Sequence, residues 1–483
     1  MKRATISTAI AALVFLSAGA AARDLNRQSY QVGERAAGMG GAFTALTGDA
    51  ASSYYNPAGL AGLGKQGISL SASMYQLLME SYHDALDVDM GGGSRLQAAM
   101  NSRTFGTFPS SVIYVLPLDD RPADAFWHQV LAFSVLVPHY DKYNGSLDRP
   151  LGEYAFELKG SLFNEDTTYW AGPSYALALG RLRLGVSLFA LFHLSDMRYN
   201  LAVKTWVTDD NLGDMFLYAA QSFERSGFGI TMLAQAGVQY DITERLTVGL
   251  SLRSPTFGTF YSSASLLFFN SAYAEDVNGN PIVDEEIQDY VDRIETEDVT
   301  MNYRLPLKLA LGVAYRVPGL LLAALDLSLH LPQGPYYLFT GPGVYPTDAV
   351  GRPIIDNDRA LVPDDRRKNS LVFNANLGVE VTLARDYFLR AGVFSDLSAV
   401  DQGFYDTSAD SRLDALYLPR LQRIGTTLGF GLRGERTTTG INVTYTYGFG
   451  KGFSFNNLFG AAGTKTAASA HTFTLCLAGS ADL

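Results

Sequence analysis

Apolar and polar side chains alternate strictly over stretches of about ten residues from Gly67 onward. Tyr303–Arg316 is the clearest case, because its odd positions are all apolar while Arg304, Lys308 and Arg316 fall on the opposite face. A period of two is that of a β-strand, and about ten residues allow a tilted strand to cross a bilayer. The same pattern recurs in Leu325–Leu331, Leu371–Val381 and Ile441–Phe449. It predicts strands with one lipid-facing side and one lumenal side.

About fourteen such segments follow one another along the chain. They lie near residues 67–78, 110–118, 128–140, 167–180, 181–197, 227–241, 245–262, 302–316, 319–331, 369–383, 385–397, 422–434, 436–449 and 469–479. Tight turns such as Gly180–Arg181 alternate with long gaps such as Ser263–Met301. Short periplasmic turns and long outer loops are typical of outer-membrane barrels. We therefore predict an all-β fold, a fourteen-stranded antiparallel transmembrane β-barrel. A soluble sandwich also alternates, but it does not explain these strand lengths.

The chain begins with a segment typical of a secretory signal peptide. Lys2 and Arg3 precede an apolar run, and small residues end it at Ala22. We expect cleavage there, so that residues 1–22 take no part in the fold; an uncleaved anchor is the alternative. The only cysteine, Cys476, has no partner for an internal disulfide, and the net charge of −11 argues against nucleic acid.

The stretch Gly33–Leu60 is too rich in small residues for a lipid-facing strand and too apolar for an exposed linker. Its glycines at 38, 40 and 41 allow close backbone approach or positive φ. Asn56, Pro57, Ala58 and Gly59 form a turn signal. We predict that residues 23–66 form a compact hatch inside the lumen and that residues 67–483 form the barrel around it.

Catalytic patterns are missing from the sequence. The six histidines lack metal-binding spacing such as HExxH, and no GxSxG motif is present. We therefore expect no enzyme activity, no metal and no cofactor. The charged residues assigned to the lumen have two interpretations: they fill the barrel and hold the hatch, or some of them neutralise the carboxylate of an apolar ligand. These residues are Arg253, Arg304, Lys308, Arg316, Asp326, Glu380, Arg390, Arg423 and Arg433.

Two predicted outer loops, Asp209–Ser226 and Asp284–Glu297, show helical spacing of apolar residues. Their apolar faces either pack on the barrel rim or line a groove at its mouth. The ligand-binding candidates are Leu212, Met215, Phe216 and Phe223 from the first loop, with Phe43, Tyr54 and Tyr55 from the hatch. Prolines 173 and 255 interrupt predicted strands and indicate either curvature or an opening in the wall.

The hatch sequence resembles that of the FadL/TodX family of outer-membrane transporters for hydrophobic compounds. The resemblance rests on Gly38–Ala45, Asp49–Ala50 and Asn56–Ala58, together with the strand count. It implies passive uptake of long-chain fatty acids or other hydrophobic small molecules, gated by the hatch, in a monomer surrounded by outer-membrane lipid. The sequence shows no kinked third strand of the kind that opens a side window in some members, since 128–140 is regular until Pro138. The exit route is therefore open between the side of the barrel and the periplasm.

The same opening, GERAAGMGGAFTAL followed by NPAGL, is also similar to PorV-type barrels that act as shuttles in protein secretion. A continuous apolar pocket in the lumen favours transport. A sealed lumen below a protein-sized loop platform favours the shuttle.

Overall fold

The computed structural model describes most of the chain. The described residues are 28, 30–91, 94–108, 110–122, 125–149, 156–209, 213–282, 290–340, 344–345, 362–363, 366–384, 386–401, 420–452 and 466–483. The predicted signal peptide, residues 1–22, lies outside them. Among the described residues, no helix is long and apolar enough to cross a membrane.

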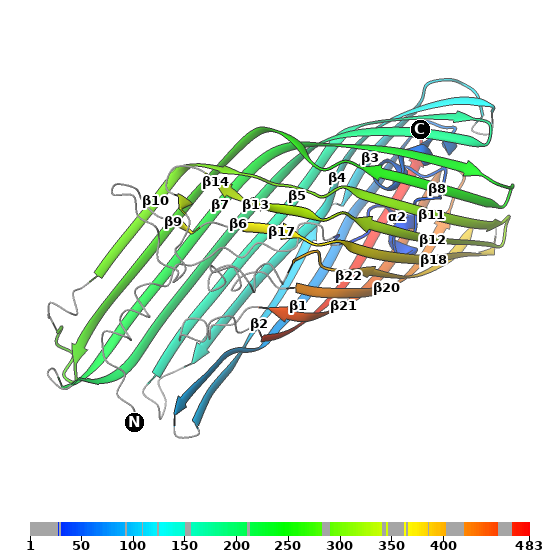
Figure 1. Cartoon of the computed structure of the whole chain (residues 1–483). Helices are drawn as coiled ribbons and strands as arrows, with labels where there is room; N and C mark the ends of the chain where they lie inside the picture. Colours follow the sequence, from blue (N-terminus) through cyan, green and yellow to red (C-terminus); the bar gives the residue numbers. More distant parts are fainter. Residues whose placement is uncertain are drawn as a thin grey trace.

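Fourteen antiparallel strand positions close into a barrel, in which β22 pairs with β1 (Figure 1). Around the wall they are β1 (Gly67–Gly91), β2 (Ser94–Phe108) with β3 (Ser111–Pro117), β4 (Trp127–Arg149), β5 (Phe156–Leu179), β6 (Leu182–Asp209), β7 (Gly213–Asp241), β8 (Leu246–Arg253) with β9 (Phe257–Asp276), β10 (Tyr290–Met301) with β11 (Lys308–Val317), β12 (Leu321–His330), β18 (Val372–Ala384), β19 (Tyr387–Asp396), β20 (Arg420–Arg433), β21 (Thr437–Gly452) and β22 (Thr466–Asp482). Short strands lie between β12 and β18: β13 (Gln333–Tyr337), β14 (Phe339–Thr340), β15 (Val344–Tyr345), β16 (Val362–Pro363) and β17 (Arg366–Asn369). The predicted fold class and strand count are confirmed.

Alternation sets the two faces of the wall. On β11, Leu311, Val313 and Tyr315 are exposed on the outside, whereas Ala310 and Ala314 are buried. The prediction fails just before this strand. Tyr303 is 3% exposed and Arg304 is exposed, the reverse of the expected assignment. The reason is that residues 302–307 are not part of a strand, so the alternation that holds in β11 does not extend back through them.

The wall is much taller on one side than on the other. Strands β6, β7 and β9 extend well beyond the ends of β11, β12 and β18 (Figure 1). The expected helix in Asp209–Ser226 is wrong, because Gly213–Ser226 belongs to β7 and pairs with β6 along its whole length. In the second predicted helix, the described part from Tyr290 belongs to strand β10.

The first of these errors has a simple cause. Met215, Ala219 and Phe223 are four residues apart, a spacing that places side chains on one face of either a helix or a strand. Pairing with the long neighbouring strand β6 makes this segment a strand, and the local sequence does not show which strand it will pair with.

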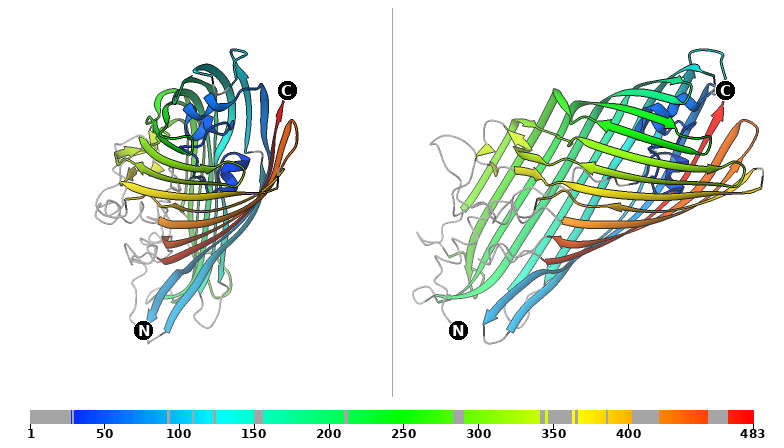
Figure 2. Two further views of the ribbon diagram at one scale, coloured as in Figure 1. Left: turned by 90° about the vertical axis from the view of Figure 1, so that its right-hand side faces the viewer. Right: turned by 45° about the vertical axis from the view of Figure 1, so that its right-hand side comes forward.

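Inside the barrel, near the end with the short turns, lies the segment Tyr30–Leu63, hereafter the plug (Figure 2). It contains three short helices: α2 (Glu34–Gly38), α3 (Ser52–Tyr55) and the 3₁₀ helix η1 (Pro57–Gly62). Asn56 caps η1, accepting a hydrogen bond from the Ala58 amide with Pro57 in the first turn. The helices are too short to be stable alone, so the surrounding wall must hold the plug in shape.

Candidate functional site

A row of lumen-facing glycines, hereafter the glycine belt, gives the plug its seat. The belt consists of Gly185, Gly237, Gly249, Gly312, Gly378, Gly392 and Gly440, on strands β6, β7, β8, β11, β18, β19 and β21. A methyl group added at Gly249 would collide with the carbonyl oxygen of Thr44, and one at Gly392 would collide with the amide of Gly40. At five of these glycines the main chain of the plug lies directly on the main chain of the wall, whereas Gly237 and Gly440 make room for the side chains of Asn56 and Glu34.

The plug glycines contribute to the same contact. Gly38 lies so close to β21 that an added methyl would come within 2.6 Å of the Asn442 amide oxygen. Gly40 and Gly41 have φ of 63° and 77°, values that favour glycine. Both of the roles expected for these glycines, close approach and positive φ, are present.

Asp326 on β12 holds the middle of the plug. Its Oδ2 atom accepts hydrogen bonds from the amide of Phe43 at 2.7 Å, and from the amide and hydroxyl of Thr44, each at 2.8 Å. All three residues are buried. Buried amides without partners are costly, so this single carboxylate fixes the turn at 43–44.

Asn56 and Gln239 hold the second half of the plug. The Asn56 amide donates to the Thr44 carbonyl at 2.7 Å and to the carbonyl of Val238 on β7 at 3.2 Å. Gln239 donates to the carbonyls of Thr44 and Leu46, both at 2.9 Å. Asn56 of the predicted hatch motif therefore ties two parts of the plug to each other and to the wall.

Four charged residues hold the first half. Arg35 donates to both oxygens of Glu380 at 3.0 and 2.8 Å, and Arg390 donates to Glu380 at 2.7 Å. Arg390 also forms an ion pair with Glu34. Two cations and two anions thus alternate between helix α2 and strands β18 and β19, and their charges balance.

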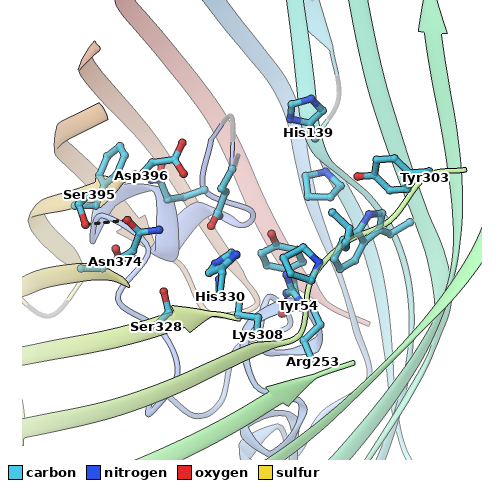
Figure 3. Close-up of a pocket in the computed structure, with 18 residues that line it drawn as sticks. Tyr54, His139, Arg253, Tyr303, Lys308, Ser328, His330, Asn374, Ser395 and Asp396 are labelled. Atoms are coloured by element: carbon cyan, nitrogen blue, oxygen red, sulfur yellow. Dashed lines mark hydrogen bonds between the residues drawn. The ribbon is translucent and has the colours of Figure 1, made fainter. Parts of the chain in front are cut away.

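Above the plug lies a lumenal cavity of about 70 Å³ (Figure 3). One side is aromatic: Tyr54 of the plug, Trp170 of β5 and Tyr303 form it, with Tyr54 and Trp170 centroids 5.4 Å apart. The other side is polar and includes Ser328, His330, Asn374, Asn376 and Ser395. Such a space admits a few waters or a small head group rather than a long chain.

Among the described residues, an arginine, a lysine and one buried carboxylate, that of Asp396, line the cavity. Arg253 donates to the Tyr54 carbonyl at 2.9 Å, and its guanidinium lies over the rings of Tyr54 and Trp170 at 4.6 and 4.7 Å. Lys308 lies on the next strand, opposite Arg253 in the ladder. In the described part of the chain, no hydrogen bond or ion pair within 4 Å engages the Lys308 ammonium group. This cation is available to an anionic group in the cavity.

The wall beside the cavity has a break in its hydrogen-bond ladder. Strand β4 pairs with β3 as far as Leu136 and with β2 only at Gly145 and Ser146. Within the described residues, the segments 103–108 of β2 and 138–143 of β4 therefore form no ladder with each other. A bulge between Leu136 and His139 shifts the register of β4 at this point.

Tyr140 fills this break. By alternation it belongs to the outer face of β4, yet its side chain packs against the cluster of Tyr30, Ala37, Met74 and Cys476. A methyl group at Gly106 of β2 would lie only 3.0 Å from the Tyr140 ring. The ring thus passes through the gap between the two strands. The third strand is regular as far as Leu136, as expected, and the bulge at Pro138 is the irregularity that the sequence did not reveal.

The other predicted ligand-binding residues are distributed as follows. Phe43 is fully buried between plug and wall and does not line the cavity. Tyr55 accepts a hydrogen bond from the Val32 amide at 3.0 Å, and burial raises the pKa of its phenol well above the ordinary value. Met215 and Phe223 are buried on the inner face of β7, whereas Phe216 lies on its outer face beneath Lys204. Leu212 lies outside the described residues.

The predicted lumenal charges fall into three groups. Those in contact with the plug or the cavity are Arg253, Lys308, Asp326, Glu380 and Arg390. Arg423 is buried on the inner face of β20. Arg304, Arg316 and Arg433 are exposed, and Arg304 lies over the ring of Tyr336 rather than in the cavity. Asp326 forms its hydrogen bonds with the plug.

Several residues of the site escaped the sequence analysis. Trp170, Gln239 and Tyr140 each looked like an ordinary strand residue. The contact between the belt glycines and the plug depends on strand register, which places Gly185 beside Gly237, Gly249 beside Gly312 and Gly378 beside Gly392.

Comparisons with known proteins agree with this architecture. No protein-family model matches the chain, and no curated protein matches it. Solved structures do match. A FadL homologue of Pseudomonas aeruginosa is 13% identical, with a TM-score of 0.57 over 94% of this chain and 99% of that one. The toluene transporter TodX of P. putida is 14% identical, with a TM-score of 0.55 over 94% and 99%. At identities of 13% and 14%, the similarity to these structures establishes the fold alone.

Proposed function

We propose that this barrel, which shares its fold with the FadL homologue and TodX, is an outer-membrane channel for passive uptake of hydrophobic compounds. Its apolar outer face suits a bilayer, and the signal peptide expected at its N-terminus would export it. The observation that carries the proposal is the ladder break between β2 and β4, which lies beside the lumenal cavity. A hydrophobic compound gains nothing from a water-filled pore, but it does gain from a side passage between lumen and lipid.

The route follows from the positions of cavity, plug and break. Pro138 and His139 line the cavity and lie at the edge of the break on β4. Below the cavity, the glycine belt and Asp326 hold the plug against the wall, so the way down is narrow. A compound that reaches the cavity therefore leaves sideways past Tyr140. The plug segment around Tyr54 shifts to make room, because the cavity is smaller than a long chain.

The polar side of the cavity supports an acidic ligand. Lys308 and Arg253 offer two cations to a carboxylate, and the rings of Tyr54 and Trp170 offer an apolar surface to the chain that carries it. Long-chain fatty acids have this combination. Aromatic hydrocarbons would use the ring surface alone.

A protein-secretion shuttle is the second candidate. The close seal between plug and wall favours it, since a shuttle does not need an open lumen. The ladder break favours the channel, since a shuttle has no use for a passage through its wall.

Uptake of radiolabelled oleate and toluene by cells carrying the barrel tests the proposal. Tyr140→Ala should raise the uptake of both compounds several-fold, and Tyr140→Trp should lower it. Lys308→Met should weaken oleate binding about tenfold, as expected for one charge-assisted hydrogen bond, and leave toluene unchanged. Tyr315→Ala is the matched control, because Tyr315 is 44% exposed on the outer face of β11, away from the break.

Three results would overturn parts of this proposal. If uptake is unchanged in both Tyr140 variants but ceases when the plug is cross-linked to β12, the exit leads to the periplasm. If Lys308→Met reduced the uptake of oleate and toluene equally, Lys308 would not be part of a carboxylate-binding site. No uptake of either compound, together with a secreted protein bound to the loops, would favour the shuttle.

A further inference from the structure

His128 of β4 contacts both the end of the plug and the β3–β4 turn, at the end of the barrel with the short turns. It is the second residue of β4, and its side chain is fully buried. Its Nε2 atom lies 2.8 Å from the carbonyl oxygen of Leu63, the last residue of the plug. Its Nδ1 atom lies 2.9 Å from Oδ1 of Asp119 in the turn between β3 and β4. Nothing in the uptake route above uses this residue.

Both partners of His128 are hydrogen-bond acceptors. A peptide carbonyl has no proton to give, and an ionised carboxylate has none either. A neutral imidazole carries a proton on only one nitrogen, so it could make one of these two bonds but not both. Turning the ring over would place carbon atoms 2.8–2.9 Å from two oxygens, closer than C–H···O contacts come. The geometry therefore requires a proton on each nitrogen.

The surroundings keep Asp119 ionised. Its carboxylate also accepts hydrogen bonds from the amides of Gln129 at 2.9 Å and Arg121 at 3.1 Å. The pKa of Asp119 lies below its ordinary value, chiefly because His128 donates to it.

Among the described residues, the other charged groups near this contact are few. The turn contributes Asp120 and Arg121, whose guanidinium donates to the Trp127 carbonyl. The segment after the plug contributes Lys65, which pairs with Asp482. On β5, the ladder partner of His128 is the uncharged Ala178, and Tyr175 donates to Gln129. Asp119 is therefore the anion that the imidazole directly contacts.

We propose that His128 is a doubly protonated anchor that ties the hinge of the plug to the β3–β4 turn, and that it releases this hinge when it loses one proton. Leu63 is followed within four residues by Gly67, where β1 begins, so it is the point about which the plug would swing. The sign follows from the geometry. Both bonds are present while the imidazole is charged, and one is lost as the pH rises and the ring becomes neutral. At very low pH the anchor also fails, because Asp119 takes up a proton.

Two variants separate this anchor from ordinary packing. In Asp119→Asn, the new amide group can donate to Nδ1 of a neutral His128, while Nε2–H still donates to Leu63 and the amide oxygen still accepts from Gln129; only the bond from the Arg121 amide, which shares Oδ1, is lost. The anchor should then persist without a charge. In His128→Gln, one amide nitrogen cannot serve both acceptors, so the anchor should be weak at every pH. His83→Gln is the control, since His83 is exposed on the outer face.

The test is hydrogen–deuterium exchange of peptides covering residues 59–66 in the full barrel, corrected for intrinsic pH dependence, together with nitrogen NMR of ¹⁵N-labelled histidine. In the wild type and His83→Gln, we expect protection to fall about tenfold as the His128 signal changes from charged to neutral, the factor for about one hydrogen bond. Asp119→Asn should stay protected throughout, and His128→Gln should be unprotected throughout. A neutral His128 signal while the hinge is fully protected in the wild type would overturn the anchor. So would unchanged pH dependence in Asp119→Asn. Neither readout depends on uptake, so the outcome is independent of the proposed function.

Discussion

The two sides of the barrel hold the plug in opposite ways. From β6 around to β19, the glycine belt brings the main chain of the plug against that of the wall, and Asp326, Gln239, Glu380 and Arg390 add buried polar bonds. On the side of β1, β2 and β4, an apolar cluster makes much of the contact and Ser134 and His128 of β4 add two polar bonds, while β2 and β4 form no ladder with each other over six residues of each strand. One side is a rigid seat and the other is a filled gap.

This difference shows where such a barrel can change shape at low cost. Moving the plug off its seat would expose buried amides and carbonyls, each of which costs about 1–3 kcal/mol without a partner. Moving Tyr140 out of the gap breaks no ladder hydrogen bond. On the proposed function, a compound leaving the lumen would therefore meet less resistance through the wall than through the plug. Four substitutions, from the largest expected effect to the smallest, test this contrast.

Asp326→Ala should loosen the plug most. It leaves the buried amides of Phe43 and Thr44 without an acceptor, at a cost of roughly 2–6 kcal/mol in plug stability. Hydrogen exchange of residues 40–47 in the folded barrel measures this loss. Asp326→Asn, which keeps one oxygen, should lose less. Equal exchange in all three proteins would show that the seat does not depend on this carboxylate.

Gly249→Ala should displace the plug by steric overlap. The new methyl collides with the Thr44 carbonyl, and overpacking of this kind costs about 1–3 kcal/mol. Single-channel conductance in planar bilayers should rise, since a displaced plug admits ions. Gly334→Ala is the matched control, because nothing lies within 4 Å of a methyl at that position. If both variants stay closed, the belt is not what seats the plug.

Tyr140→Ala tests the other side. The ring is only partly buried, so its loss should cost the plug about 1–2 kcal/mol, less than the 3–5 kcal/mol for a fully buried aromatic. Thermal unfolding of the barrel in detergent should hardly change. A loss as large as that of Asp326→Ala would abolish the distinction between seat and gap.

Lys65→Ala should have the smallest effect. Lys65 pairs with Asp482 at 3.1 Å, but its side chain is 67% exposed and the Asp482 side chain 44%. Exposed pairs contribute about 0–1 kcal/mol. Chemical unfolding should therefore coincide with that of the wild type. A marked shift would mean that the Lys65–Asp482 ion pair holds the segment joining plug and barrel more strongly than His128 does.

The barrel could be predicted from the sequence because a single local pattern, the alternation of apolar and polar residues with a period of two, indicates it. Alternation along β11 or β21 reports which face meets lipid, and it needs no knowledge of neighbouring strands. The plug was predictable for a similar reason, since small residues in Gly33–Leu60 suit neither lipid nor water. The functions of Asn56 and Asp326 were beyond the sequence, because they depend on which strand each residue faces.

The errors have the same origin. Tyr303 follows the alternation of β11, but the chain leaves the wall before reaching it, and Tyr303 instead stacks on His193 at 4.0 Å. Pro138 marked a disturbance of the third strand, yet a proline alone does not reveal that β2 fails to pair there. Both facts depend on strand partners, and partners follow from closing the whole barrel.

The glycine belt has a consequence for how the molecule folds. Phe43 and Asp326 are 283 residues apart in the chain, and Gly38 and Thr427, which share a hydrogen bond, are 389 apart. Contacts of such sequence separation form slowly. The plug is made first but acquires its seat only when strands as late as β20 have arrived. Until then the plug lacks the contacts that fix its conformation, and the barrel closes around it.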